Sequence, residues 1–242
     1  MNRNIIVAVA IAVAALLIFG VLAVQRGALT FSEGMPRFNG AIFMHPQPSI
    51  DREVTFPESF PENARPVYLS NLEKIKTLIK EDVNNYTAWN DLAIYYRMVE
   101  DHEGAGEVWR YLVAKYPNNG LLVHNLAEFE FHTTKNYAKA EELYAKAIAL
   151  QPNMGLNYTD LHEMYRYAYK QDTPAAEEIL KQGLQHVDVR LQVDFNTMLA
   201  DYYIEKGRRD DAIAALTAAR DIARALGNTA LVTRLNNQIE AL

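Results

Sequence analysis

The residues best suited to chemistry are two histidines and a glutamate on one predicted helix. His124 and His132 lie eight residues apart, and Glu128 lies midway between them. Such side chains can bind a transition metal. Eight helical residues span about 12 Å, however, so all three side chains would have to bend towards one ion. We therefore interpret them as solvated or partner-facing residues, and we expect neither a metal site nor a cofactor.

Other catalytic patterns in the sequence are incomplete. The segment GAG at 104–106 has no third glycine and falls in a predicted turn between helices, so it is not a dinucleotide-binding fingerprint. His162, in the segment HEMYR, lacks the second histidine of a zinc-protease helix. The sequence has no phosphate-binding loop, no G-x-S-x-G motif and no cysteine. We therefore expect no catalytic residues and no enzymatic activity.

Composition excludes several classes of protein. Half of the 242 residues are apolar, which is enough for a sizeable core and argues against a disordered chain. The net charge is −6, and Lys and Arg do not cluster as phosphate neutralisation requires, so we expect no nucleic-acid partner. The absence of cysteine leaves the redox compartment open.

The N-terminal region contains a long apolar segment. After a short tail at residues 1–4, residues 5–24 carry no polar side chain, and a helix of this length spans about 30 Å, as a bilayer core requires. The alternative is a cleaved signal peptide with Val21 and Ala23 at its cleavage site. Because the apolar region of a signal peptide is usually shorter, we expect a retained single-pass transmembrane anchor.

Charges on the two sides of this segment are nearly balanced. Arg3 precedes it, whereas Arg26 and Arg37, offset by Glu33, follow it. With so short a tail, a signal-anchor orientation would place the N-terminus in the cytoplasm. We expect the bulk of the chain on the extracytoplasmic side of the membrane.

Residues 25–66 form a predicted tether. Six of the nine prolines of the chain fall here, and each proline removes a backbone donor and favours an extended residue before it. Yet the segment also carries apolar side chains, including the patch GAIFMHP at 40–46. Two interpretations remain open: a semi-rigid spacer with incidental aromatic residues, or a strap whose patch docks on the domain, the membrane or a partner.

Four copies of a two-part helical pattern follow. In the second part a small residue precedes a large apolar one by four positions, at repeat spacings of 35, 36 and 36 residues: Ala105 with Trp109, Ala140 with Tyr144, Ala176 with Leu180, and Ala212 with Leu216. The first part of each copy places a leucine at the same position: Leu92, Leu126, Leu161 and Leu199. Repeats of this length indicate stacked supersecondary units.

The pattern resembles the tetratricopeptide repeat (TPR) family over residues 86–226. The first copy matches the family motif with the following residues: Trp89, Leu92, Ala93, Tyr96, Ala105, Trp109 and Pro117. Later copies depart from it at Glu130, His162 and Asn196. The resemblance implies an all-α, TPR-type solenoid of about four helix pairs, each burying its apolar face against its neighbours.

Two further helices complete the predicted repeat domain at residues 67–242. An apolar stripe at Leu72, Ile75, Ile79 and Val83 predicts an unpaired helix before the first pair. Downstream, Leu231, Leu235 and Ile239 share one face of a closing cap helix, as a solenoid requires for solubility.

The resemblance also implies a partner-binding groove lined by the first helix of each pair. Carrying the family's groove positions over residue by residue gives the following set: Asn90, Ile94, Arg97, His124, Glu128, Phe131, His132, Thr159, Glu163, Arg166, Tyr167, Asp194, Thr197 and Asp201. A partner with basic and apolar residues would suit such a groove. The alternative is that some of these residues form an ordinary solvated helix face.

The expected function is that of a membrane-tethered scaffold or adaptor that binds a protein or peptide. The order of anchor, tether and repeats is similar to that of accessory factors in envelope protein assembly, although architecture alone does not define function. The alternative is a structural subunit packed permanently into a larger membrane complex.

Overall fold

The computed structural model describes residues 29–32, 35–38 and 46–242. The chain divides into two compact units, residues 1–46 and residues 47–242. The predicted anchor at 5–24 lies outside the described residues, as does most of the GAIFMHP patch. Among the described residues, no helix is both long enough and apolar enough to cross a membrane.

The described part of the first unit is a short antiparallel hairpin. Strand β1 (Leu29–Ser32) pairs with β2 (Met35–Phe38), with Leu29 opposite Phe38 and Ser32 opposite Met35. Pro36 is tolerated in such a ladder because a two-stranded sheet leaves one edge of each strand unpaired.

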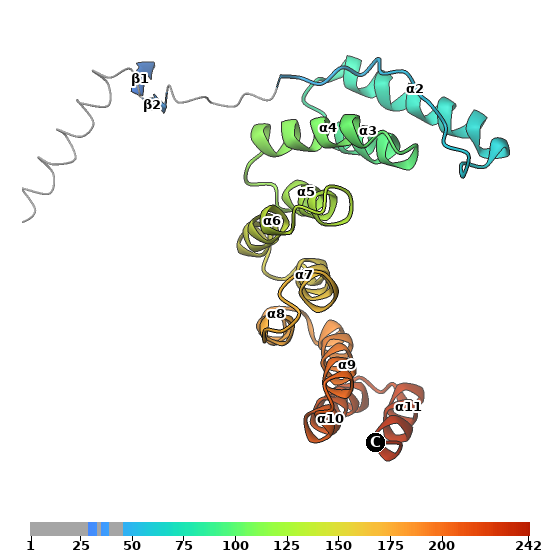
Figure 1. The fold of residues 1–242 in the computed structure, drawn as a ribbon, viewed down its shortest axis with the longest axis vertical. Coiled ribbons are helices and arrows are strands. Elements are labelled where there is room, and N and C mark those ends of the chain that lie inside the picture. Colours follow the sequence, from blue (N-terminus) through green and yellow to red (C-terminus); the bar gives the residue numbers. More distant parts are fainter. Residues whose placement is uncertain (1–28, 33–34, 39–45) are drawn as a thin grey trace, which may run out of the picture. The chain divides into compact units, whose positions relative to one another are not determined.

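The second unit is built from helices. A 3₁₀ turn, η1 (Glu62–Ala64), leads into these helices: α2 (Arg65–Glu81), α3 (Tyr86–Met98), α4 (His102–Lys115), α5 (Gly120–His132), α6 (Tyr137–Leu150), α7 (Gly155–Tyr167), α8 (Ala175–Gly183), α9 (Val189–Glu205), α10 (Arg209–Ala225) and α11 (Thr229–Glu240). Helices α3 to α10 form four consecutive pairs, which follow one another from α3/α4 to α9/α10 (Figure 1). Helix α2 precedes them and α11 packs on α10, which confirms the predicted helix-pair solenoid.

Capping residues set the helix boundaries. Six helices begin after an Asn or Asp whose side chain accepts a hydrogen bond from a backbone N–H of the first turn: Asn85, Asp101, Asn119, Asn136, Asp188 and Asn228. The loops that follow α3, α5, α7 and α9 each contain a residue in the left-handed region: Glu100, Lys135, Lys170 and Gly207. Only Gly207 adopts this conformation without steric cost.

The repeat motif forms the core. The motif rings Trp89, Tyr96, Trp109 and Tyr144 are all almost completely buried, as are the small residues that open the second pattern: Ala105, Ala140, Ala176 and Ala212. Alanine at these positions lets neighbouring helices approach closely, and the rings fill the spaces between them.

The unpaired helix α2 differs from the prediction at its end. Leu72, Ile75 and Ile79 are buried as expected, but the helix stops at Glu81 because Asp82 is extended. Val83 therefore lies beyond the helix and is exposed, although its carbonyl oxygen accepts a hydrogen bond of 3.0 Å from Trp89 Nε1.

Residues 47–61, which we call the N-terminal strap, form neither helix nor strand. Four of its apolar side chains are partly buried against the helices: Ile50, Val54, Phe56 and Phe60. Phe56 and Phe60 lie edge-on to Tyr68 of α2, at centroid distances of 5.3 and 5.4 Å. This packing places the start of the compact unit at Gln47, before the first helix.

Candidate partner-binding face

The first helices of the four pairs, α3, α5, α7 and α9, form a continuous surface that we call the A-helix face. A polar side-chain contact joins each of these helices to the next. Arg97 on α3 donates to Glu128 on α5 at 2.9 Å, and Arg166 on α7 reaches Glu205 on α9 at 2.5 Å. Between them, His124 Nε2 on α5 lies 3.6 Å from Asp160 Oδ2 on α7. Side-chain contacts therefore link the four helices in chain order.

The predicted trio of His124, Glu128 and His132 is split between three environments. His124 is buried, and its Nδ1 lies 2.9 Å from Asn157 Oδ1 on α7. Glu128 accepts from Arg97, and the exposed His132 ring lies 4.1 Å from the Phe131 ring. In residues 46–242 and the hairpin, no group of His, Asp and Glu side chains has a metal-binding arrangement.

A buried polar cluster lies beneath the middle of the face. Burial raises the pKa of Asp160, an effect that the nearby His124 opposes and Glu128 reinforces. Tyr144 on α6 is fully buried, and its hydroxyl has no hydrogen-bond partner within the described part of the chain. Burial raises the pKa of Tyr144, and the negative charges of Asp160, Glu128 and Glu163 raise it further.

Other expected groove residues are occupied by contacts within the domain. Asn90 Oδ1 accepts from Trp109 Nε1 at 3.1 Å and from Asn125 Nδ2 at 2.7 Å. The Thr159 hydroxyl donates to the Leu156 carbonyl. Phe131 is buried, as is His124, because both rings fill space between helices. These four side chains of the expected set support the face rather than present a binding surface.

The remaining predicted residues reach solvent. The exposed members of the predicted groove set are His132, Glu163, Tyr167, Asp194 and Asp201. Arg97, Glu128 and Arg166, together with Ile94 and Thr197, are partly exposed. Arg166 also stacks over the Tyr167 ring at 4.9 Å.

The charge of the face is not balanced. Arg97 and Arg166 are neutralised by Glu128 and Glu205. In contrast, no ion pair forms to Glu163, Asp194 or Asp201 from any residue that the structure describes. The face therefore presents uncompensated negative charge, mainly on α7 and α9.

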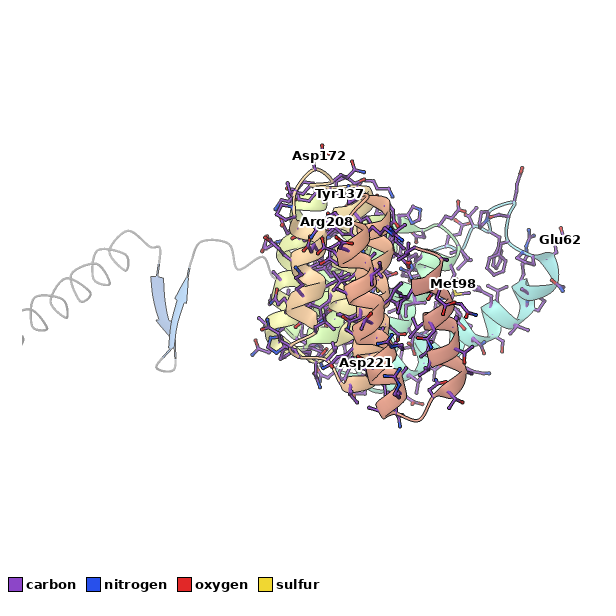
Figure 2. The ribbon with its side chains drawn as sticks, turned by 90° about the horizontal axis from the view of Figure 1, so that it is seen from below. Glu62, Met98, Tyr137, Asp172, Arg208 and Asp221 are labelled. Carbon is purple, nitrogen blue, oxygen red and sulfur yellow. The ribbon has the colours of Figure 1, made fainter. Side chains whose placement is uncertain are left out.

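Apolar side chains stand near the C-terminal ends of the same helices. Met98 of α3 is 51 % exposed, Tyr167 of α7 58 % and Ile204 of α9 46 %; Met98 is labelled at the surface in Figure 2. Sequence reasoning missed Met98 and Ile204. The offset of Met98 from Leu92 equals that of His132 from Leu126 and of Tyr167 from Leu161, so this regularity could have identified Met98.

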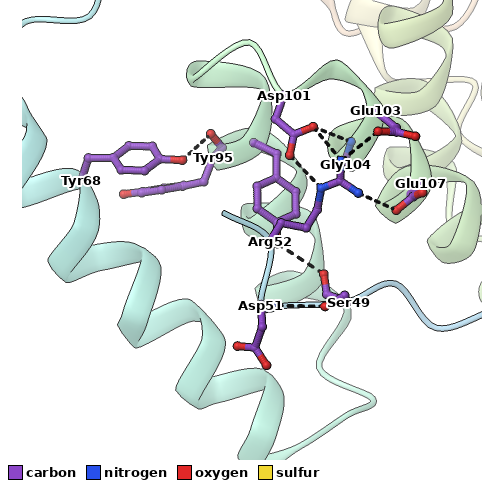
Figure 3. Close-up of polar contacts among 10 residues, drawn as sticks. Ser49, Asp51, Arg52, Tyr68, Tyr95, Asp101, Glu103, Gly104 and Glu107 are labelled. Atoms are coloured by element: carbon purple, nitrogen blue, oxygen red, sulfur yellow. Dashed lines mark hydrogen bonds and ion pairs between the residues drawn. The ribbon is translucent and has the colours of Figure 1, made fainter. Parts of the chain in front are cut away.

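A second polar cluster, which sequence reasoning also missed, fixes the strap. Arg52 donates to both carboxylate oxygens of Asp101, at 2.8 and 3.1 Å, and to Glu103 and Glu107 at 3.1 and 3.2 Å (Figure 3). The hydrogen bonds to Asp101 raise the pKa of Arg52, although burial opposes this. A pocket of about 590 Å³ lies beside the cluster, lined in part by Glu53, Glu100 and Asp101. All three carboxylates that bind Arg52 come from the α3–α4 turn and the start of α4, so the cluster anchors the strap to the first helix pair.

Together, the paired helices, their small-residue contacts and the continuous A-helix face define an all-α solenoid with the TPR fold. The solved structure of MamA is 18 % identical, covering 69 % of this chain and 94 % of the MamA chain, with a TM-score of 0.53. That of PilW, a widely conserved type IV pilus biogenesis factor, is 21 % identical, covering 74 % of this chain and 88 % of the PilW chain, with a TM-score of 0.51. These likenesses support the fold.

The structure of TTC0263, a thermophilic TPR protein in Thermus thermophilus, is also 21 % identical, with coverages of 74 % and 94 % and a TM-score of 0.48. No family model matches the sequence. No curated protein matches it either.

Proposed function

We propose that this chain is a non-catalytic protein-interaction scaffold whose A-helix face binds a segment of a protein partner. The observation that carries the proposal is the character of that face: exposed apolar side chains beside carboxylates without a counter-charge. Solvated helix faces usually intersperse charges of both signs and bury their large apolar groups. Exposed apolar groups together with an excess of charge of one sign are typical of a surface that binds a complementary partner.

Membrane tethering is part of the proposal. The apolar segment at 5–24 has the length of a bilayer span, and we place the helix pairs on the extracytoplasmic side. PilW is a pilus biogenesis factor, which is compatible with a role in envelope assembly for this chain. Extraction of membranes at alkaline pH tests the tether: the full chain should stay with the lipid, and a chain without residues 5–24 should not. Release of the full chain would exclude a retained anchor.

A structural subunit packed permanently into a larger complex would bury its apolar tether against a partner. Phe56 and Phe60 instead pack on Tyr68 of the same chain, and Arg52 is saturated by carboxylates of the same chain. This part of the tether is already covered, so the observation favours the scaffold.

Comparative affinity capture tests the scaffold function. The full chain, solubilised in detergent, is compared with a Glu163→Lys/Asp201→Lys variant. Both side chains are exposed and form no ion pair within the described residues, so the fold should persist. The matched control is Asp172→Lys/Glu178→Lys, which makes the same charge change on exposed residues outside the A-helix face. A co-purifying protein lost only from the first variant supports the proposal; equal recovery from all three proteins contradicts it.

A further inference from the structure

The strap lies on its own helices as an extended peptide lies on a protein surface. Its even-numbered side chains are the more buried ones, and its odd-numbered side chains are exposed. Pro48 is buried and Ile50, Arg52, Val54 and Phe56 are partly buried, whereas Ser49, Asp51, Glu53 and Thr55 are exposed. Such alternation is the period of an extended chain. Residues 47–56 belong to no strand, so their side chains decide which sequence this surface accepts.

Arg52 lies in a site that fits a guanidinium group. Its side chain donates to Asp101, Glu103 and Glu107, at the start of α4 (Figure 3). Gly104 leaves the space that this requires, because a β-carbon at that position would lie 2.7 Å from Arg52 Nε. A guanidinium presents its donors in a fixed fork, which an ammonium group does not reproduce. The surface therefore selects arginine at this position.

Apolar contacts fix the register on both sides of Arg52. Ile50 and Val54 precede and follow it by two residues, and both pack against the core. Phe56, four residues after it, lies 5.3 Å from the Tyr68 ring of α2. The surface thus recognises an arginine together with apolar side chains at alternate positions.

The charge of the strap matches this surface poorly. Three carboxylates surround the single guanidinium of Arg52, so negative charge is in excess within the cluster. The strap adds two more carboxylates, Asp51 and Glu53, and no ion pair forms to either of them within the described residues. Neighbouring like charges repel each other. A segment with neutral or basic residues beside its arginine would complement the surface better than the strap does.

The strap also leaves space beside it. The pocket of about 590 Å³ is lined by Arg52, Glu53, Thr55 and Pro57 of the strap and by residues 99–101 of the α3–α4 turn. Closely packed protein surfaces leave few voids larger than a water molecule. Glu53 shares this pocket with the carboxylates of the turn, so a basic side chain at its position would gain a counter-charge there.

We infer that the surface formed by α2, α3 and the start of α4 is a second binding site of the scaffold. It binds an extended segment of a protein partner in which an arginine has apolar residues two and four positions away and neutral or basic residues next to it. The strap occupies this site in the free chain, and the partner's segment displaces it. Binding here is independent of the A-helix face, so either proposal can fail alone.

The test measures the binding of fluorescent peptides to the full chain by anisotropy at fixed low salt. The first peptide copies residues 47–58, QPSIDREVTFPE, and the second carries lysine at the positions of Asp51 and Glu53. The third has the composition of the second, with its apolar residues contiguous. We expect the second peptide to bind at least about fivefold more tightly than either of the others, because it alone combines the alternation with a favourable charge.

Variants of the protein locate the binding. Arg52→Ala weakens the strap, so a larger fraction of molecules has an open site, and the second peptide should bind about tenfold more tightly than it binds the wild type. Phe56→Ala, which changes no charge, should act in the same direction. Adding Glu103→Gln/Glu107→Gln to Arg52→Ala removes two acceptors of the arginine and should weaken binding about tenfold. Adding Glu142→Gln/Glu178→Gln instead, on exposed residues of α6 and α8, should leave the affinity unchanged.

Two results would overturn the inference. Equal binding of the second and third peptides would mean that charge alone attracts them. Equal affinity of the wild type and both strap variants would mean that the strap does not compete for the site. Neither result bears on the A-helix face, whose own test is the Glu163→Lys/Asp201→Lys variant.

Discussion

Arg52 in the strap and Asp101 at the start of α4 form a two-pronged pair, in which Nε and Nη2 donate to the two carboxylate oxygens at 2.8 and 3.1 Å. Asp101 also accepts from the backbone N–H of Gly104, so the carboxylate that caps α4 holds the strap as well. This ion pair therefore links the strap to the N-terminal end of α4 in the first helix pair.

Loss of this pair should loosen the strap. We expect Arg52→Ala to lower the free energy of unfolding by about 1–2 kcal/mol, a range that allows for solvent screening of the partly exposed guanidinium. Proteolysis within residues 47–61 should become faster, whereas Arg209→Ala, at an exposed arginine in the same domain, should change neither quantity. Unchanged cleavage in Arg52→Ala would show that the aromatic contacts alone hold the strap.

The buried indole of Trp89 should contribute strongly to stability. It is fully buried, lies 5.3 Å from the Tyr111 ring and donates to the Val83 carbonyl. We expect Trp89→Ala to cost about 3–5 kcal/mol by opening a cavity. Tyr167→Ala, at an exposed ring, should cost less than about 1 kcal/mol. Denaturant titration of both variants measures this difference, and similar costs would contradict the assignment of the core.

The loops after α3, α5 and α7 each contain a non-glycine residue in the left-handed region, and a substitution by glycine there should stabilise the fold instead of destabilising it. Lys135 has φ +57°, which costs a residue with a Cβ about 1–2 kcal/mol. Lys135→Gly should therefore stabilise the fold by about 0.5–1 kcal/mol, because the added entropy of the unfolded chain offsets only part of the relief.

Gly207 provides the matched comparison, since it has φ +70° and a Cβ there would meet no atom within 4 Å. Gly207→Ala should destabilise by about 1 kcal/mol through the backbone alone. Melting curves of the two variants should shift in opposite directions, and a shift in the same direction would refute this account of the loops.

Acid should weaken the contact between the last two helix pairs. Burial would raise the pKa of Glu177, but hydrogen bonds from Lys181, Arg208 and Tyr203 outweigh it and lower that pKa below its ordinary value. A carboxylate with a lowered folded-state pKa contributes stability above its unfolded pKa of about 4.3, and this stability is lost as the pH falls through the folded value.

Glu177→Gln should therefore cost about 1–2 kcal/mol at pH 7 and progressively less below about pH 4. Melting temperatures of wild type and variant, measured from pH 7 to pH 3, should converge. Glu178→Gln, at the exposed neighbouring residue, should follow the wild type throughout. A constant gap between wild type and Glu177→Gln would rule out Glu177 as the titrating group.

The sequence predicted the fold well because its signals are local and repeated. An alanine followed four residues later by a large apolar residue, as in Ala105 and Trp109, recurs in every unit, so four weak matches in one register define the helix pairs and their core. The ends of the helices were less predictable. The apolar stripe continues to Val83, and nothing in it indicates that Asp82 is extended and that α2 ends before it.

The site was only partly predictable, because a helical offset gives the direction of a side chain but not its partner. His124 occupies a groove position, yet its contacts with Asn157 and Asp160, distant in sequence, make it an interior residue. The three carboxylates around Arg52 are likewise about 50 residues away in the chain. No local pattern identifies such contacts.

The central claim, that a protein partner occupies the A-helix face, is tested most directly by site-specific photocross-linking in intact membranes. The photoreactive residue p-benzoyl-L-phenylalanine is placed in the full chain at position 167 on the face, or at the exposed position 146 on α6. We expect position 167 to yield a discrete cross-linked protein that Glu163→Lys/Asp201→Lys abolishes, and position 146 to yield none. Cross-linking from position 146 alone, or a product at 167 that survives the charge reversal, would contradict the account.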